Sequence, residues 1–237
     1  MKEGSGRFKT VGVIGAMASE IDALISDIAD PVRETVSGVG FVSGEYGNVR
    51  LVAARCGVGK VFAAVCVQTM ILRYAPDVIV NIGVGGSLTP GLNIADICVA
   101  SAAVQHDMDT SAVGDPVGMI SGINVIEFPT DPAAREGLVE AAESLGKNVM
   151  SGVIASGDVF VCDTGRKNFI RDTFSALVCE MEGGAVAQTC YINGTSFCIL
   201  RAVSDNGDEN APDSYGDALQ RASDAALDVT RVWLASL

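Results

Sequence analysis

The sequence predicts an α/β fold contained in one domain. Short runs rich in Val and Ile alternate with amphipathic stretches along the whole chain, which is the pattern of alternating strands and helices. The 237 residues, 49% of them hydrophobic, suffice for one large core, and no repeat or interdomain linker divides them. We therefore expect residues 1–237 to form a single domain, with residues 1–9 as a flexible N-terminal extension.

The first half of the chain contains five candidate strands. They are β-branched or alternating runs at residues 10–14, 40–46, 49–55, 78–82 and 96–105. A helix is expected over residues 19–28, and Pro31 stops it because proline cannot continue a helix. A second helix, over residues 61–74, is apolar on most of its faces, so we expect it to be packed on both sides. The glycines of residues 83–86 are expected to form a loop.

The second half is less regular over residues 107–130 and then alternates again. Asp131 and Pro132 form a favourable N-cap and first turn for a helix. Further strands are expected at residues 149–155, 176–179 and 197–203. Further helices are expected at residues 165–173, 184–192 and 215–234, the last of them after a loop rich in Asn, Asp and Gly.

Charge and composition disfavour several functions. With 16 Lys and Arg against 29 Asp and Glu, the net charge is −13, and no basic cluster is present for nucleic acid or an anionic membrane surface. The N-terminus lacks the apolar core of an export signal, and no apolar run approaches the roughly 20 residues that span a bilayer. We expect a cytoplasmic protein that binds neither nucleic acid nor membrane.

The seven Cys and the single His show no metal-ligand spacing. No C-x-x-C pair occurs and His106 stands alone, so neither a zinc site nor a disulfide framework is indicated. Most of the Cys are expected to be buried reduced thiols. We expect no metal and no organic cofactor.

Three acidic residues share one position relative to the predicted strands. Glu20, Glu182 and Asp205 each come just after a strand, and ligands of open α/β sheets bind outside those strand ends. Three carboxyls in one crevice would raise each other's pKa. The alternative interpretation is structural: Glu20 and Glu182 would complement helix dipoles, and Asp205 would cap the following loop.

The residues around these acids also allow two interpretations. Met17, Met181 and Phe160 would suit a pocket for a flat or thioether-bearing ligand, or they belong to the core. Residues 56–60, Cys-Gly-Val-Gly-Lys, resemble half of a dinucleotide fingerprint, but Phe62 stands where its third glycine should be. The glycines of residues 83–86 would let a ligand approach the backbone, or they form a tight turn.

Six motifs occur in order over nearly the whole chain. They are IGAM at 14–17 with Glu20, NIGVGG at 81–86, HDMDT at 106–110, SGDVF at 156–160, EMEGGA at 180–185 and RAVSD at 201–205. With these motifs the chain closely resembles the 5′-methylthioadenosine/S-adenosylhomocysteine nucleosidases of the nucleoside phosphorylase superfamily. The resemblance implies a three-layer α/β/α sandwich with a mixed, partly barrel-like central sheet, and a homodimer. It also implies hydrolysis of the N-glycosidic bond of 5′-thioalkyl adenosines to adenine and a thioribose.

The resemblance also implies a role for each matching residue. Asp205 matches the acid that protonates adenine N7, Glu20 the base that activates water, and Glu182 the carboxylate that holds the ribose hydroxyls. These roles are coherent, because glycoside cleavage needs an acid on the leaving group and a base on water. Phe160 aligns with the residue that stacks on adenine, and Arg201 with an arginine near the water and the ribose. The substrate-binding residues implied in this way are Met17, Val58, Gly85, Phe160, Val161, Met181, Arg201, Ser204 and Tyr215.

Two positions depart from the family pattern. Val84 stands where the family usually has a small hydroxyl residue near the water, and Ser87 is a candidate substitute. Thr110 and Val113 stand where bulkier apolar residues often cover the 5′ end, in some cases from the neighbouring subunit. The preferred 5′ substituent therefore stays open.

Phosphorolysis and binding without turnover are the alternative functions. A phosphorylase needs cations for its dianionic nucleophile, but the loop of residues 15–20 has no Lys or Arg and ends in Glu20. Phosphate beside this carboxylate would cost several kcal/mol, which Arg201 alone would hardly offset. A pure binding protein would not require both Glu20 and Asp205. Hydrolysis of an adenine nucleoside is therefore the expected function.

Overall fold

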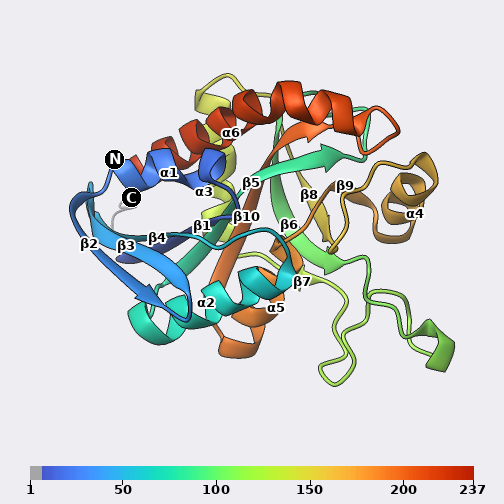
Figure 1. Ribbon diagram of the computed structural model, residues 1–237, viewed down its shortest axis with the longest axis horizontal. Coiled ribbons are helices and arrows are strands. Elements are labelled where there is room, and N and C mark those ends of the chain that lie inside the picture. The colour runs from blue at the N-terminus through green and yellow to red at the C-terminus, as the bar shows by residue number, and fades with distance from the viewer. Residues whose placement is uncertain (1–6) are drawn as a thin grey trace.

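The computed structural model of the protein describes residues 7–237, in which strands and helices alternate (Figure 1). The strands are β1 (Thr10–Gly15), β2 (Ala29–Val36), β3 (Val39–Tyr46), β4 (Val49–Arg55), β5 (Val78–Ser87), β6 (Ile97–Gln105), β7 (Phe128–Pro129), β8 (Val149–Ser156), β9 (Ala176–Glu180) and β10 (Ser196–Asp205). The helices are α1 (Ala18–Ser26), α2 (Lys60–Tyr74), α3 (Pro132–Ser144), α4 (Thr164–Phe174), α5 (Gly183–Asn193) and α6 (Ala211–Ala235), with one 3-10 turn, η1 (Ser111–Val113).

The strands of residues 7–237 form one mixed, ten-stranded sheet. Its order is β10-β6-β8-β9-β5-β1-β4-β3-β2, with β7 paired to β6. Because β10 also pairs in parallel with β5, the path from β5 through β9, β8, β6 and β10 returns to β5 and closes. The mixed sheet implied by the family resemblance is confirmed, and its closed part brings the ends of β5, β9 and β10 together.

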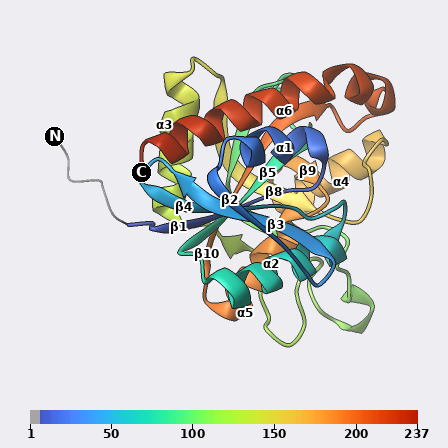
Figure 2. The same cartoon turned by 60° about the vertical axis from the view of Figure 1, so that its left-hand side comes forward.

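Helices cover both faces of the sheet, as Figures 1 and 2 show. On one face α1, α3 and α6 pack through an apolar cluster that includes Trp233, and on the other α2 and α5 pack through a cluster that includes Met70. Successive strand residues point to opposite faces, so Val80 of β5 belongs to the first cluster and Ile79 to the second. The three-layer α/β/α arrangement is therefore confirmed.

The boundaries of several elements differ from the sequence expectation. Pro31 lies within β2, an edge strand that was not predicted, at a register irregularity between Ala29 and Val32. Proline is tolerated there because an edge strand at a bulge does not need every N–H. The expected glycine loop is also wrong, since residues 83–86 continue β5 as far as Ser87.

The prediction that the second helix is packed on both sides is wrong within this chain. One side of α2 lies on the sheet, but Val61, Phe62 and Leu72 are 74%, 58% and 78% exposed. Tyr191 and Ile192 of the neighbouring α5 are exposed as well. The apolar composition of α2 thus reflects a buried side and an apolar surface.

Residues 7–9 of the predicted N-terminal extension are attached to the domain. Phe8 is buried and its ring packs edge-on against Trp233, with 6.4 Å between the ring centroids. The backbone N–H of Lys9 donates to Asp77 at 2.7 Å. The remainder of that extension, residues 1–6, lies outside the described residues. In the part from residue 7 onward, no helix has the length and apolarity needed to cross a membrane.

Candidate active site

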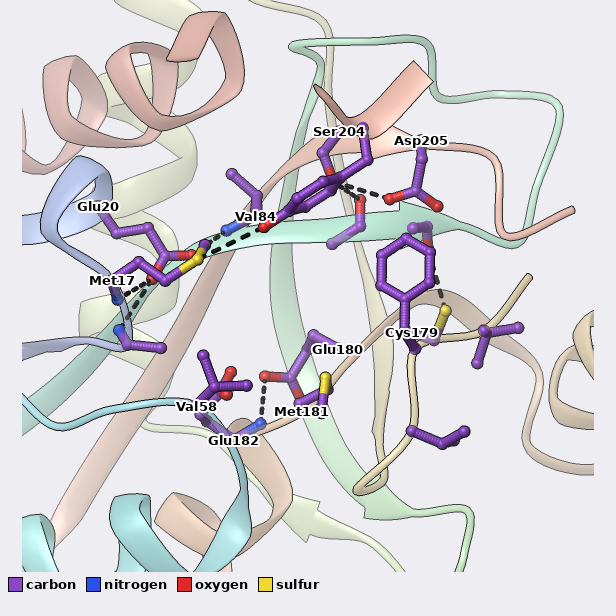
Figure 3. A pocket seen from close by; sticks show the side chains of 17 residues that line it. Met17, Glu20, Val58, Val84, Cys179, Glu180, Met181, Glu182, Ser204 and Asp205 are labelled. Atoms are coloured by element: carbon purple, nitrogen blue, oxygen red, sulfur yellow. Dashed lines mark hydrogen bonds between the residues drawn. The ribbon is translucent and has the colours of Figure 1, made fainter. Parts of the chain in front are cut away.

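A cavity lies at the carboxyl ends of β1, β5, β9 and β10 (Figure 3). The predicted site residues that line it are Met17, Glu20, Val58, Gly85, Phe160, Val161, Met181, Glu182, Ser204, Asp205 and Tyr215. The lining residues outside the set of predicted catalytic and substrate-binding residues are Ala16, Val84, Gly86, Val159, Cys179 and Glu180. The cavity thus brings together three acids that are up to 185 positions apart in the chain, the span from residue 20 to residue 205.

Glu20 enters the cavity from the first turn of α1, and it is 3% exposed. Its Oε2 accepts the backbone N–H groups of Ala16 and Met17 at 2.8 and 2.9 Å, and Oε1 accepts that of Val84 at 3.0 Å. Burial raises the pKa of Glu20 above its ordinary value, although a nearby guanidinium and these N–H groups favour the ionised form. Gly83 makes room for the carboxylate, because a Cβ there would lie 2.5 Å from Oε1.

Asp205 is the last residue of β10 and lies elsewhere along the cavity wall (Figure 3). Its Oδ1 accepts the N–H of Gly207 at 2.8 Å, and Oδ2 accepts the hydroxyl of Ser204 at 2.9 Å. Burial raises the pKa of Asp205, against the effect of these two donors. A Cβ on Gly86 would lie 2.7 Å from Oδ1, so the glycines of β5 leave space for two separate acids.

Glu182 precedes α5 and makes no capping hydrogen bond to that helix. Its Oε1 instead accepts the N–H of Gly59 at 2.8 Å, from the loop before α2. Burial and the negative charge of Glu180 raise the pKa of Glu182 to about 7, while Arg201 acts in the opposite direction. Glu182 therefore lies at the start of α5 without capping it through its side chain, whereas Glu20 and Asp205 bind local backbone N–H groups.

Arg201 lies behind the acids and does not line the cavity, unlike the other predicted substrate-binding residues. It is 1% exposed, and its guanidinium donates to both the backbone and the side-chain oxygen of Asn81, at 3.0 and 2.6 Å. It also donates to Glu180, and it lies 3.7 Å from Oε2 of Glu182. In this structure the guanidinium therefore contacts other protein groups, and its contact with substrate stays a prediction.

An apolar wall faces these acids. The rings of Phe160 and Tyr215 meet edge to face with their centroids 5.4 Å apart, and the hydroxyl of Tyr215 donates to the sulfur of Met17 at 3.4 Å. Phe160 is 41% exposed, so it does not belong to the core. Aromatic and thioether side chains beside a few polar groups are typical of small-molecule sites.

A cluster of charged residues includes two that lie close in the chain to the lining residues Val58 and Val159. Asp158 accepts the backbone N–H of Lys60 at 2.8 Å, and its own N–H donates to Asp107 at 2.9 Å. The ammonium of Lys60 completes the cluster by donating to Asp107 at 2.7 Å. Carboxylates of the protein itself thus occupy the N–H groups of Gly59 and Lys60, within the fingerprint-like pattern of residues 56–60.

Thr110 and Val113 do not line the cavity of this chain. Val113 lies in η1 and is 83% exposed, and the hydroxyl of Thr110 donates to Asp115 at 2.8 Å. Figure 1 shows η1 at the end of a segment that projects from the sheet. Within one chain these two residues therefore do not cover the cavity.

The chemistry of the cavity is that of proton transfer. Three of its carboxyls have raised pKa values, so they can exchange protons nearer to neutral pH than ordinary acids do. In the part of the chain that the structure describes, no group of three or more His, Cys, Asp and Glu is arranged to hold a metal ion.

Glu180 was missed as an individual residue, although its place at a strand end two residues before Glu182 was a usable signal.

Comparisons with known proteins agree on one family. The model of the Phosphorylase superfamily matches residues 10–235. The 5′-methylthioadenosine/S-adenosylhomocysteine nucleosidase of Anoxybacillus flavithermus is 36% identical over 219 residues, which cover 90% of this chain and 92% of the relative.

Solved structures agree with this match. The nucleosidase of the same name from Neisseria meningitidis, in complex with methylthio-immucillin-A, has a TM-score of 0.93 at 35% identity and covers 97% of this chain and 100% of its own. A futalosine hydrolase from Helicobacter pylori has a TM-score of 0.92 at 33% identity and covers 97% of this chain and 98% of its own.

Proposed function

Because the chain belongs to the 5′-methylthioadenosine/S-adenosylhomocysteine nucleosidase family within the Phosphorylase superfamily, we propose that it hydrolyses the N-glycosidic bond of 5′-thioalkyl adenosines. The products are adenine and the corresponding thioribose. Candidate substrates are 5′-methylthioadenosine, S-adenosylhomocysteine and 5′-deoxyadenosine. The observation that carries this proposal is the set of three buried acids with raised pKa values around one cavity with an apolar wall.

Each acid has a role in this proposal. Asp205 donates a proton to adenine N7, so that the base departs as a neutral leaving group when the C1′–N9 bond breaks. Glu20 takes a proton from the water that attacks C1′. Glu182 holds the ribose hydroxyls, and its charge stabilises the oxocarbenium-like transition state. The support is that Glu20 and Asp205 are held by different donors at separate positions of the cavity, as an acid and a base on opposite sides of a sugar require.

The bound base would contact Phe160 and Val161, with the ring of Phe160 stacked on adenine and the backbone of Val161 at its edge. Met17, Val58, Met181 and Tyr215 would surround the ribose and the thioalkyl group. These positions all line the cavity, and their side chains provide the apolar contacts that a methylthio group needs.

Hydrolysis is favoured over phosphorolysis by the charge of the cavity. No Lys or Arg lines it within residues 7–237, and the nearby guanidinium of Arg201 is already engaged by Glu180. A phosphate dianion beside Glu20 would therefore meet uncompensated negative charge in a poorly solvated space. Water carries no such penalty.

We expect purified protein to release adenine from 5′-methylthioadenosine at the same rate with and without added phosphate. The measurement is chromatographic detection of adenine and of the sugar product, with kcat/KM compared for the three candidate nucleosides and for futalosine. Formation of a sugar 1-phosphate that depends on phosphate would assign a phosphorylase instead. Binding without any adenine release would assign a nucleoside-binding protein, and a preference for futalosine would assign the activity named for the Helicobacter pylori neighbour.

We also expect the protein to form a homodimer through the exposed apolar side chains of α2 and α5. Leu72→Glu with Ile192→Glu should therefore halve the mass measured by light scattering, because two charges would be buried in the interface. Val32→Glu is the matched control, since Val32 is 64% exposed on β2. A wild-type mass equal to one chain would reject the dimer.

A cytoplasmic location is part of the same proposal, and it is supported by seven cysteines that are all free thiols.

A further inference from the structure

Glu180 is a buried carboxylate of the cavity wall to which the proposed reaction assigns no role. It ends β9 and is 6% exposed. It accepts hydrogen bonds from the hydroxyl of Ser156, from the guanidinium of Arg201, and from the backbone N–H groups of Glu182 and Gly183 at 3.0 and 2.8 Å. These donors belong to β8, β10 and the start of α5. Because protein groups occupy both of its oxygens, Glu180 has little capacity left for a ligand.

Arg201 is the cation that pairs with this carboxylate. Both groups are almost fully buried, and they form a direct ion pair. Glu182 is the next carboxylate, with its Oε2 3.7 Å from the guanidinium. A buried cation stabilises the ionised form of every acid within a few ångströms, unless another acid takes up its charge.

We propose that Glu180 is a positioning residue of this site, acting through Arg201 and Glu182. It fixes the position of the guanidinium and of the start of α5. Its negative charge also compensates the positive charge of Arg201, so that Glu182 and Glu20 face the cavity without a full counter-ion of their own. This inference rests on the proposed hydrolysis for its functional meaning. The effect of Glu180 on the ionisation of Glu182 does not depend on any substrate or activity.

The charged and titratable groups that face Glu182 come from five parts of the fold. They are Glu20 of α1, Cys56 after β4, Glu180 of β9, Arg201 of β10 and Tyr215 of α6. The only cation in this set is Arg201, and the ammonium of Lys60, two positions beyond Val58, is directed to Gln105 and Asp107. Neutralising Glu180 would therefore leave Arg201 to act on Glu182 and Glu20 unopposed.

The direct test is the titration of the Glu182 carboxyl by ¹³C NMR in protein labelled at Glu, with its signal assigned by its loss in Glu182→Gln. In Glu180→Gln the midpoint should fall by about one pH unit or more, from a wild-type pKa of about 7. Glu140→Gln is the matched control, because it removes one negative charge at an exposed position of α3 and should leave the midpoint unchanged. A midpoint that is the same in Glu180→Gln and wild type would overturn the proposal.

Two further variants keep the test decisive if Glu180→Gln does not fold. Arg201→Gln should move the Glu182 midpoint upward, because the charge of Glu180 would then act without compensation. The double variant Glu180→Gln/Arg201→Gln should return it toward the wild-type value. A purely structural role of Glu180 predicts no such opposite shifts, so equal or absent shifts would reject the proposal.

Turnover gives the second measurement. Glu180→Gln should lower kcat for 5′-methylthioadenosine by about tenfold, and Glu180→Asp, which keeps the charge, should recover part of the loss. If wild-type protein releases no adenine, the proposed function fails while the titration still tests Glu180. If wild type is active and the titration shows no shift, only the role of Glu180 fails.

Discussion

Asp205→Asn is expected to lower kcat by about a hundredfold or more while most of the affinity for the nucleoside remains. Burial raises the pKa of Asp205, so the carboxyl can hold the proton that adenine N7 must receive. An amide has nearly the same shape and can still bind Gly207 and Ser204, but it has no acidic proton to transfer. The measurement is kcat for adenine release together with the Kd of a non-hydrolysable analogue.

A control for this variant lies close by in the chain. Asp213→Asn removes the same charge from an exposed position in the first turn of α6, and it should keep near-normal turnover. A loss of activity in both variants would indicate disturbance of the loop that joins β10 to α6. Near-normal turnover in Asp205→Asn would remove Asp205 from the mechanism.

Glu20→Gln is expected to lower kcat by a similar factor of about a hundred, because the base that activates water is lost. The effect should also change the pH dependence. The ionised form of Glu20 is the active one, and burial raises its pKa, so wild-type kcat should rise with pH at values above the ordinary range of Glu. In Glu20→Gln the part of this rise that belongs to Glu20 should disappear, which a pH–kcat profile measures.

The backbone around Glu20 provides an independent check. Three N–H groups point at its two oxygens, and an amide can satisfy them only in part, which costs about 1–3 kcal/mol of stability. Gly83→Ala keeps the carboxylate but places a Cβ 2.5 Å from Oε1, so it should displace the group and lower kcat as well. If Glu20→Gln keeps the wild-type kcat and pH profile, Glu20 is not the base.

The fold was predictable to the extent that it depends on local pattern. The buried run of Val and Ile in β1 and the Asp131 cap of α3 were recognised from the sequence, and the cap is confirmed by its bonds to Ala133 and Ala134 at 3.0 and 3.1 Å. β2 was missed because a proline such as Pro31 is compatible both with the end of a helix and with an edge strand. The extension of β5 through residues 83–87 was missed because glycines favour a loop unless neighbouring strands pair with them, and β10 and β9 do so.

The candidate site was predictable where a residue lies at the end of a strand or a few positions after it. Glu20, Glu182 and Asp205 could be grouped because the ends of neighbouring strands meet at one edge of a sheet. Arg201 could not be placed correctly, since its position behind the wall depends on Asn81 and Glu180, which lie on two other strands.

The sequence by itself determined the alternation of elements, the family, and the residue types that reach the cavity, because these follow from local periodicity and from motifs only a few residues long. Tertiary structure alone decided the closure of β5 with β10, the exposed apolar side of α2, and the pairing of Arg201 with Glu180. The strand closure and the ion pair join segments that are distant in the chain, so their energies are contained in no local stretch of sequence. The exposure of α2 depends on which elements pack against it, which is equally a property of the whole fold.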